Sequence, residues 1–438
     1  MDVRKSIPFR KKLDEKASPE LKYVAYLSKR RIPESDLPLF SAPEEGSGVL
    51  YRWSGTHWEM VSPYDCERMA WKWLTENCPN EATPRKAQSC SNAACLEIFK
   101  IPSPQKTSII IPTKSGYLHV GQSDFLLTLM NADPALGITY CLNCPYDPEV
   151  TAPLFKGFME EVLPDPDVRD LVQEYAGYTL LGDTRFQKAQ WWIGSGANGK
   201  GTLAQIIAAL HQRASALSID SLDGFRLVPL LDATLIYVDE TPKKIDEQRL
   251  KTLLSGDLVS IDRKYRDPVS FRPSAKWIVL GNDLPAISDQ SDGFWRRWHV
   301  IPFPVSFGEG QQRPLLAKQI IDHELSGVLN WALDGLLKLL GRGHFLPPPR
   351  TVRDAIQRGR KESNNVLAWL EEAEPVVSGL PATPKDDIYA AYREWSQKNG
   401  TPSVSATRFW TRVRQIHPEI AEDREGSGKR RRTVNVFL

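Results

Sequence analysis

A lysine that closes a glycine-rich stretch has the clearest chemical role in this sequence. Gly194, Gly199 and Lys200 have the spacing G-x-x-x-x-G-K within WWIGSGANGKGT. Glycines at such positions let backbone N–H groups surround phosphate oxygens, and the lysine reaches the terminal phosphates. An apolar strand pattern before the loop and a helical pattern after it favour this function over a glycine-rich turn with a solvated lysine. The predicted phosphate-binding residues are Gly194, Gly196, Asn198, Gly199, Lys200, Gly201 and Thr202.

The residue after the lysine departs from the usual pattern, in which a Ser or Thr hydroxyl ligates Mg²⁺. This chain has Gly201 there, followed by Thr202. Either Thr202 takes over the role, or the metal is held mainly through water and acidic residues. Asp239 and Glu240 end the apolar segment LLDATLIYVDET. Adjacent carboxylates suit Mg²⁺ binding by Asp239 and polarisation of an attacking water by Glu240, and a plain polar strand cap is the alternative.

Three further polar residues follow later strand-like segments. Asn282 ends KWIVLGN, where an amide can orient water or touch the γ-phosphate, although an Asn before a turn is often only a turn former. Arg296 and Arg297 stand between aromatic residues in DGFWRRW. They can pair with acidic residues, or one of them can reach the nucleotide of a neighbouring subunit as an arginine finger. The predicted catalytic residues are Lys200, Asp239, Glu240, Asn282, Arg296 and Arg297.

These side chains need a common frame, which the apolar pattern of residues 188–305 indicates. Short, nearly all-apolar runs (AQWWIG, TLIYVDE and KWIVLGN) alternate there with helical or loop segments. Strands that are apolar throughout are buried on both faces, which is typical of a mainly parallel sheet covered by helices. The expected fold class is therefore α/β, with a P-loop core.

The regions around this core have other patterns. The N-terminal region is mixed α+β, with strand patterns at 49–53, 107–113 and 116–121 and a helical pattern at 65–76. A helix begins at Pro166, where Pro suits the first turn. A helix-rich stretch and a Pro/Gly-rich spacer then precede a last unit. The predicted domains are 1–165, 166–310, 311–372 and 373–438.

Several ordered motifs resemble the superfamily three helicases, in particular the helicase part of phage, plasmid and poxvirus primase-helicases. They are GSGANGKGT, YVDE, LLSGDLVSIDRKYRDPVSF, VLGNDLP and DGFWRRW, and the likeness spans roughly residues 100–438. The resemblance implies an AAA+-type ATPase core that uses ATP and Mg²⁺, a homo-hexameric ring, and 3′ to 5′ movement along single-stranded DNA. It implies metal binding by Thr202 and Asp239 and a sensor role for Asn282. It also implies that one of the two arginines is the arginine finger, with Arg296 as the first candidate and Arg297 as the second.

The resemblance also locates DNA contacts in the segment VSIDRKYRDPVSF, whose alternation predicts a hairpin. In the family this hairpin projects into the ring channel, and the matching residues are Arg263, Lys264 and Tyr265. A lysine attracts phosphate and a neighbouring aromatic ring offers a stacking face, so the pair can hold single strands without reading their sequence. A solvated basic edge is the alternative.

The last 36 residues hold eight Lys/Arg against four Asp/Glu. SVSATRFWTRVRQI predicts a Ser-capped helix with Phe409, Val413 and Ile416 on one face. Arg408, Arg412 and Arg414 are then expected outside, and GSGKRRRTVNVFL predicts a turn and strand. A helix followed by a strand with a basic tip suits a winged-helix-like DNA-binding domain. The alternative is a solvated cationic tail. The basic tip consists of Lys429, Arg430, Arg431 and Arg432.

Composition limits the remaining possibilities. The net charge of +2 excludes a uniformly basic chain, and the charged start and short apolar runs predict a cytoplasmic protein without a membrane span. Six cysteines are too few for a disulfide framework. Zinc binding is a weak alternative, resting on Cys90, Cys95, Cys141 and Cys144.

The function that these features predict is an ATP-driven replicative helicase of a phage, plasmid or integrated mobile element, acting on single-stranded and forked DNA. The N-terminal region, as a helicase-preceding domain, leaves little room for a primase fold, so a separate primase or polymerase is an expected partner. Two alternatives stay open. One is an ATP-dependent origin initiator or loader without processive unwinding, and the other is a DNA-binding protein that does not hydrolyse ATP.

Overall fold

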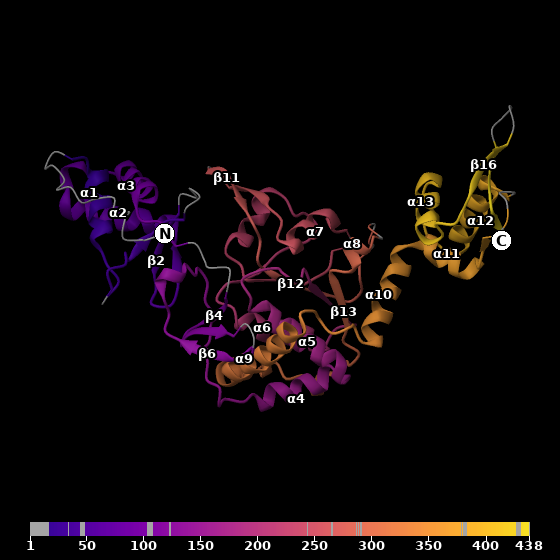
Figure 1. Cartoon of the computed structure of the whole chain (residues 1–438), viewed down its shortest axis with the longest axis horizontal. Helices are drawn as coiled ribbons and strands as arrows, with labels where there is room; N and C mark the ends of the chain where they lie inside the picture. Colours follow the sequence, from indigo (N-terminus) through magenta and orange to yellow (C-terminus); the bar gives the residue numbers. More distant parts are fainter. Residues whose placement is uncertain are drawn as a thin grey trace.

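The computed structural model arranges the chain as a central core with a smaller unit on either side (Figure 1). It describes residues 17–33, 35–43, 49–102, 108–121, 124–242, 244–263, 266–285, 287, 289, 291–377, 379, 383–425 and 431–437. The helices of the N-terminal unit and those of the C-terminal unit lie at opposite ends of the molecule (Figure 1). None of the helices in these ranges combines the length and the apolar character that a membrane span requires.

A parallel sheet forms the middle of the core, as the apolar runs predict. In the described part of the chain its strands are β7 (Ala189–Ile193), β8 (Ala214–Ala216), β9 (Leu235–Val238), β12 (Lys276–Gly281) and β13 (Trp298–Pro302). Their order across the sheet is β13–β7–β12–β9–β8, and each neighbouring pair is parallel. Every residue of β12 is buried, which fits a central strand covered on both faces.

Two hydrophobic clusters lie on opposite faces of the sheet. Trp192 and Ile278 point into one cluster, whereas their chain neighbours Trp191 and Trp277 point into the other, as the two-residue period of a strand requires. Helices cover the first face: α4 (Pro153–Val162), α5 (Pro166–Thr179), α6 (Lys200–Ala209) and α9 (Leu316–Arg342). The second face carries η4 (Gly224–Leu231), α7 (Glu247–Ser255), α8 (Asp292–Trp295) and the hairpin of β10 (Val259–Arg263) and β11 (Arg266–Phe271). The mixed α/β architecture is therefore as predicted.

Helices α5 and α9 approach each other closely because glycines face the contact. A Cβ on Gly335 of α9 would lie 2.4 Å from the carbonyl oxygen of Gln173 in α5. Helix α5 is also tied to the sheet, since the Tyr175 hydroxyl donates to the carbonyl of Trp277 (2.6 Å) and accepts from its N–H (3.0 Å). Helices α5 and α9 thus pack backbone to backbone, and the Tyr175 side chain joins this pair to β12.

The N-terminal unit is α+β, and the helix and strands predicted there are present. Its elements are α1 (Pro19–Lys29), β1 (Phe40–Ser41), β2 (Leu50–Trp53), β3 (Trp58–Val61), α2 (Pro63–Asn77), η2 (Pro79–Glu81) and α3 (Pro84–Glu97). A second sheet follows, with β4 (Ile109–Thr113), β5 (Gly116–Val120), β6 (Leu127–Met130) and then η3 (Pro134–Leu136). Ile111 and Leu118 of this sheet pack into the central core rather than into the N-terminal helices.

The C-terminal unit is built from helices and short strands around an aromatic core that includes Trp369, Tyr392 and Phe409. After η5 (Glu309–Gln311) and α10 (Arg350–Ser363), its elements are α11 (Asn365–Ala373), β14 (Val376–Val377), β15 (Thr383–Pro384), α12 (Lys385–Lys398), α13 (Ala406–Ile416), β16 (Glu422–Glu425), β17 (Arg431–Val434) and β18 (Val436–Phe437). Ser405 caps α13 as predicted. Helix α11 packs into this unit.

The glycine contact between α5 and α9 yields a stability prediction. Gly335→Ala should lower the free energy of unfolding by about 1–3 kcal/mol, because the added methyl group meets backbone that cannot move aside. Gly341→Ala in the same helix is the control: its Cβ would lie 3.8 Å from Phe125, and the higher helix propensity of Ala adds up to ~1 kcal/mol. Urea midpoints measure both variants, and equal midpoints would contradict the packing described.

Candidate active site

The predicted site residues meet at one edge of the sheet because β12 lies between β7 and β9. Val279 of β12 pairs with Trp191 on one side and with Val238 on the other. The carboxyl ends of parallel strands share an edge, so the three following loops converge there. They enclose a pocket of about 890 Å³. Of the predicted residues, Gly196, Asn198, Gly199, Lys200, Gly201, Thr202, Asp239, Glu240 and Asn282 line it.

The loop after β7 has the backbone that its glycines allow. Gly199 has φ +83°, and a Cβ there would lie 2.5 Å from Val162 Cγ1 of α4. Both the left-handed conformation and the close approach of α4 therefore require glycine. Gly194 lies outside the pocket lining, at the point where β7 ends and the loop begins.

Lys200 begins α6 and folds back onto the loop. Its Nζ donates to the carbonyl of Gly194 (2.6 Å) and to Asn198 Oδ1 (3.0 Å), and burial lowers the pKa of this lysine. The Asn198 amide is 3% exposed, and its Nδ2 has no hydrogen-bond partner among the described residues. A buried N–H donor without an acceptor is costly, so the loop has an unmet need for an anion or carbonyl. The loop therefore fits the phosphates of a nucleotide.

The acidic pair is placed differently, at the mouth of the pocket. Asp239 and Glu240 are exposed directly after β9, and neither side chain forms an ion pair with another described residue. Asn282, also exposed, follows β12. In the described ranges no group of three or more His, Cys, Asp or Glu residues could hold a metal by itself. One or two carboxylates with phosphate oxygens and water are, however, the usual ligands of Mg²⁺, so the residues present fit this ion.

Packing does not explain the glycine after the lysine. A Cβ on Gly201 would meet no atom within 4 Å, so the position has room for a Ser or Thr side chain. Thr202 lines the pocket one residue later and also lines a second pocket beside the loop. The role of Thr202 as a metal ligand stays a prediction.

Sequence reasoning missed Thr241, which holds the edge together. Its hydroxyl donates to the carbonyl of Leu280 at the end of β12 (2.8 Å) and accepts from Trp191 Nε1 of β7 (3.0 Å). A Cβ on Gly281 would lie 2.4 Å from the same hydroxyl, so glycine is required beside it. One side chain directly after β9 and the acidic pair thus bonds to residues of both β12 and β7. The signals in the sequence were a Thr directly after Glu240 and a Gly before Asn282.

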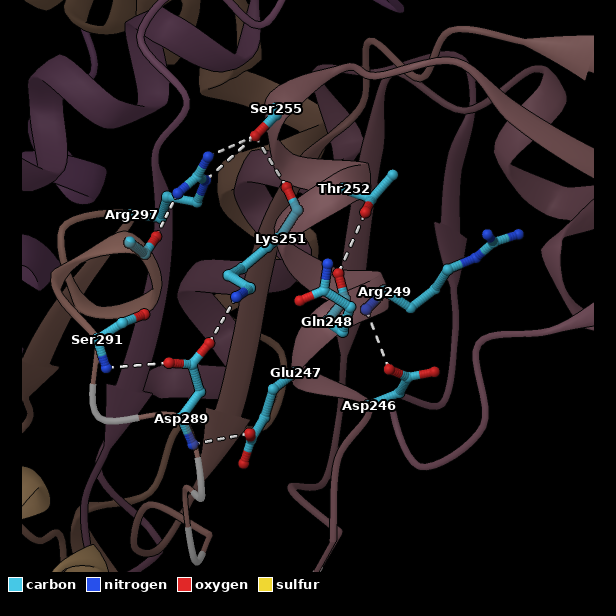
Figure 2. A network of polar contacts seen from close by, with 11 residues as sticks. Asp246, Glu247, Gln248, Arg249, Lys251, Thr252, Ser255, Asp289, Ser291 and Arg297 are labelled. Atoms are coloured by element: carbon cyan, nitrogen blue, oxygen red, sulfur yellow. Dashed lines mark hydrogen bonds and ion pairs between the residues drawn. The ribbon is translucent and has the colours of Figure 1, made fainter. Parts of the chain in front are cut away.

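The two arginines after α8 have different environments, shown in part in Figure 2. The Arg297 guanidinium donates to Ser255 Oγ of α7 (2.7 Å) and to the carbonyl of Gly293, so it is used within the chain. Arg296 is exposed, and its carbonyl accepts from Lys188 Nζ. Burial and then the nearby Arg296 lower the pKa of Lys188 to about 8. Neither arginine lines the pocket of its own chain.

Helix α7 also binds the chain just before α8 (Figure 2). Lys251 forms an ion pair with Asp289 (2.6 Å), whose N–H donates to Glu247 (2.8 Å) and whose carboxylate accepts from the N–H of Ser291 (2.9 Å). Together with Ser255 and Arg297, these contacts hold the backbone that carries Arg296 against α7.

The predicted DNA contacts are only partly described. The hairpin is present, with Val259 of β10 opposite Phe271 of β11 and Arg263 at the end of β10, but Lys264 and Tyr265 lie outside the described residues. Lys429 and Arg430 also lie outside them, and Arg431 is described by its backbone in β17 alone.

Helix α13 corrects one part of the prediction. Arg408 is exposed, but Arg412 is 9% exposed and donates to Asn364 Oδ1 (3.1 Å), so the expectation that it lies outside was wrong. Arg412 follows Phe409 by three residues, which turns it toward the core. Arg432 is exposed and pairs with Glu422 (3.2 Å).

The cysteines lie in apolar surroundings. Cys90 belongs to the N-terminal core and Cys144 to the central core, and none of the six cysteines forms a disulfide bond. Burial raises the pKa of Cys144 to about 12, which favours the thiol over the thiolate that zinc requires. Among the described residues, Cys95 and Cys141 do not belong to any group of three or more potential metal ligands.

Comparison with known proteins identifies relatives in sequence and a solved structure with a similar fold. A model described as "Family of unknown function (DUF5906)" matches residues 192–297. "Putative helicase L207/L206" of Acanthamoeba polyphaga mimivirus is 26% identical over 307 residues, 60% of this chain and 31% of that protein. "Putative primase C962R" of African swine fever virus is 23% identical over 196 residues, 42% of this chain and 20% of that protein. The chain is a relative of viral proteins named as helicases and primases. This relationship confirms the resemblance to the superfamily three helicase family.

The chain spans less than a third of the length of each of these relatives. A solved structure, the apo structure of the NrS-1 C-terminal region, has a TM-score of 0.51 at 12% identity. The match covers 96% of this chain and 99% of that chain, so the two share a fold over almost their whole length.

The bridging hydroxyl of Thr241 yields the next prediction. Thr241→Val keeps the shape of the side chain but leaves Trp191 Nε1 and the Leu280 carbonyl without this partner, which should lower stability by about 1–3 kcal/mol. Thr411→Val, on the exposed face of α13, is the matched control and should change stability by less than about 0.5 kcal/mol. Urea unfolding measures both variants. A normal midpoint for Thr241→Val would rule out the bridge as a determinant of the edge.

Proposed function

We propose that this chain is the motor of an ATP-driven DNA helicase that serves replication of a phage, plasmid or integrated mobile element. The observation that carries the proposal is the pocket in which the Lys200 loop, the acidic pair and Asn282 meet at one edge of a parallel sheet. The relationship to viral proteins named as helicases and primases supports the same class of activity.

Each residue of the pocket has a task in ATP hydrolysis that its surroundings allow. Lys200 exchanges its contacts with the Gly194 carbonyl and Asn198 Oδ1 for phosphate oxygens, and the unpartnered Asn198 Nδ2 becomes a further donor. Asp239, with Thr202, holds Mg²⁺, which neutralises charge on the phosphates when it is bound.

The remaining polar residues act on the water and on the γ-phosphate. Glu240 polarises the attacking water, and its exposed position at the pocket mouth leaves it free to do so. Asn282 lies between Lys200 and the acidic pair because β12 lies between β7 and β9. It can therefore orient the water or contact the γ-phosphate from the middle of the edge.

Arg296 is the residue that we assign to the neighbouring subunit's nucleotide. It is exposed, absent from its own pocket and held on a backbone fixed to α7, whereas Arg297 is used within the chain. A finger in trans needs a head-to-tail interface, and such interfaces close into rings, here a homo-hexamer.

DNA contacts are assigned to two places. The β10–β11 hairpin, with Arg263, Lys264 and Tyr265, follows α7 directly and would grip single-stranded DNA in the ring channel. The C-terminal unit, with the exposed Arg408 and Arg432, would dock DNA as a winged-helix-like domain. A separate primase or polymerase is the proposed partner at the fork.

One observation favours a second candidate. Gly201 lacks the hydroxyl that usually ligates Mg²⁺ although there is room for one, which favours an initiator or loader with slow turnover, or a DNA-binding protein that does not hydrolyse ATP.

Mixing two inactive variants tests the proposal. Lys200→Ala should abolish ATP turnover, and Arg296→Ala should bind ATP but lose turnover by on the order of 10³-fold. An equal mixture should regain activity, because about a quarter of head-to-tail interfaces then pair an intact Lys200 site with an intact Arg296. Arg68→Ala, exposed in α2, is the arginine control and should keep full turnover. Turnover by Lys200→Ala alone would refute the site, and mixtures without recovery would refute the finger in trans.

A further inference from the structure

A second, smaller pocket of about 240 Å³ lies against the Lys200 loop. It shares Ala197, Gly199 and Thr202 with the larger pocket, so both pockets lie against the same loop. Its other walls carry the aromatic rings of Phe158 and Phe307. No residue of the acidic pair or of β12 lines it. The pocket therefore extends from the phosphate loop, on the side away from the acids, into an aromatic environment.

Phe307 reaches the loop through backbone pairing. Beyond β13, the N–H of Phe303 donates to the carbonyl of Ile193 (2.8 Å), which continues the strand alignment. The N–H of Phe307 then donates to the carbonyl of Ala197 within the loop (2.8 Å). Ala197 has φ +45°, an unusual conformation for a residue with a side chain. The aromatic wall and the phosphate loop are thus held together by main-chain contacts.

The opposite wall comes from α4 and is also fixed. Phe158 of α4 is 4% exposed, and a Cβ on Gly199 would lie 3.1 Å from its ring. Glu324 of α9 accepts from the backbone N–H groups of Leu154 and Phe155 at the start of α4 (3.0 and 2.9 Å). These contacts anchor the helix that carries Phe158 to α9.

The rim connects α4 with the chain ahead of α9. Arg313 forms an ion pair with Glu161 of α4, and Gln311 and Gln312 line the pocket with exposed amides. Gln311 Oε1 accepts from the N–H of Gly308 (3.1 Å), and Gln312 Nε2 donates to the carbonyl of Phe307 at the long distance of 3.4 Å. Side-chain amides contain both a donor and an acceptor, which is what the edge of a nucleobase matches.

We propose that this pocket binds the base of the nucleotide whose phosphates lie at Lys200, an inference that rests on the proposed function. A chain of phosphates that starts at Lys200 passes Gly199 and Thr202, two of the residues common to both pockets, before it reaches Phe307. The ring of Phe307 offers a stacking face, which suits any base, and the amides of Gln311 and Gln312 contact its edge. Phe307 is thus a binding residue for the base and has no part in the chemistry at the γ-phosphate.

Comparing the affinities of the chain for ATP and for inorganic tripolyphosphate distinguishes the contribution of the base to binding from that of the phosphates. Calorimetric titration of the full chain without Mg²⁺ should give tighter binding of ATP than of tripolyphosphate. Phe307→Ala should weaken the affinity for ATP by roughly ten-fold and leave the affinity for tripolyphosphate unchanged. The reason is that stacking on the base is lost while the backbone hydrogen bond to Ala197 is kept. Phe307→Tyr should retain the affinity for ATP. Phe225→Ala, an exposed phenylalanine of η4, is the matched control and should behave as the unmodified chain.

The outcomes distinguish the two proposals. If Phe307→Ala is unstable, Phe307→Leu keeps apolar bulk without a stacking face and should show the same selective loss of ATP affinity. Unchanged ATP affinity in these variants overturns the base pocket while tripolyphosphate binding still supports the phosphate site. An equal loss of both ligands also overturns it, because Phe307 then only shapes the loop. Failure of the unmodified chain to bind either ligand overturns the proposed function as well.

Discussion

The parallel pairing of β12 between β7 and β9 is the constraint on which the site depends. It places the Lys200 loop, Asn282 and the acidic pair side by side at one edge, although they are separated by long stretches of sequence. Burial on both faces of the sheet holds this arrangement, since the strands contribute alternate residues to two hydrophobic clusters. At the edge itself the hydroxyl of Thr241, which follows β9 and the acidic pair, bonds to residues of both β12 and β7. Asp239, Glu240 and Asn282 can stay exposed because the apolar strands before them position them.

Helix α7 extends this frame toward the surfaces that we assign to a neighbouring subunit and to DNA. Its Lys251 and Ser255 contact Asp289 and Arg297 (Figure 2). In the chain, the helix follows the acidic pair and leads directly into the hairpin. Helix α7 therefore contacts the segments on both sides of Arg296 and continues into the base of the hairpin. One helix and its polar contacts thus link the segment after the acidic pair to both of these surfaces.

The sequence predicted the elements and residue types of the site because strong local rules govern them. Apolar runs ending in polar residues indicated buried strands, and the spacing of Gly194, Gly199 and Lys200 indicated the loop. The strand order could not be predicted, because β7, β9 and β12 have the same apolar pattern and only tertiary packing orders them. Thr241 has no motif, and its role depends on partners 50 and 39 residues away in sequence. Arg412 was expected outside with the other arginines of its helix, although its spacing of three residues from Phe409 turns it inward, where Asn364 from a distant helix boundary binds it.

The central claim is that the pocket at this edge hydrolyses ATP in order to act on DNA. The most direct test is steady-state ATP turnover of the full chain with Mg²⁺, in the absence of DNA and with saturating single-stranded oligodeoxythymidine. The account predicts measurable turnover that single-stranded DNA increases several-fold, since nucleotide site, α7 and hairpin form one connected frame. Absence of turnover, or turnover that DNA leaves unchanged at every oligonucleotide length, would contradict it.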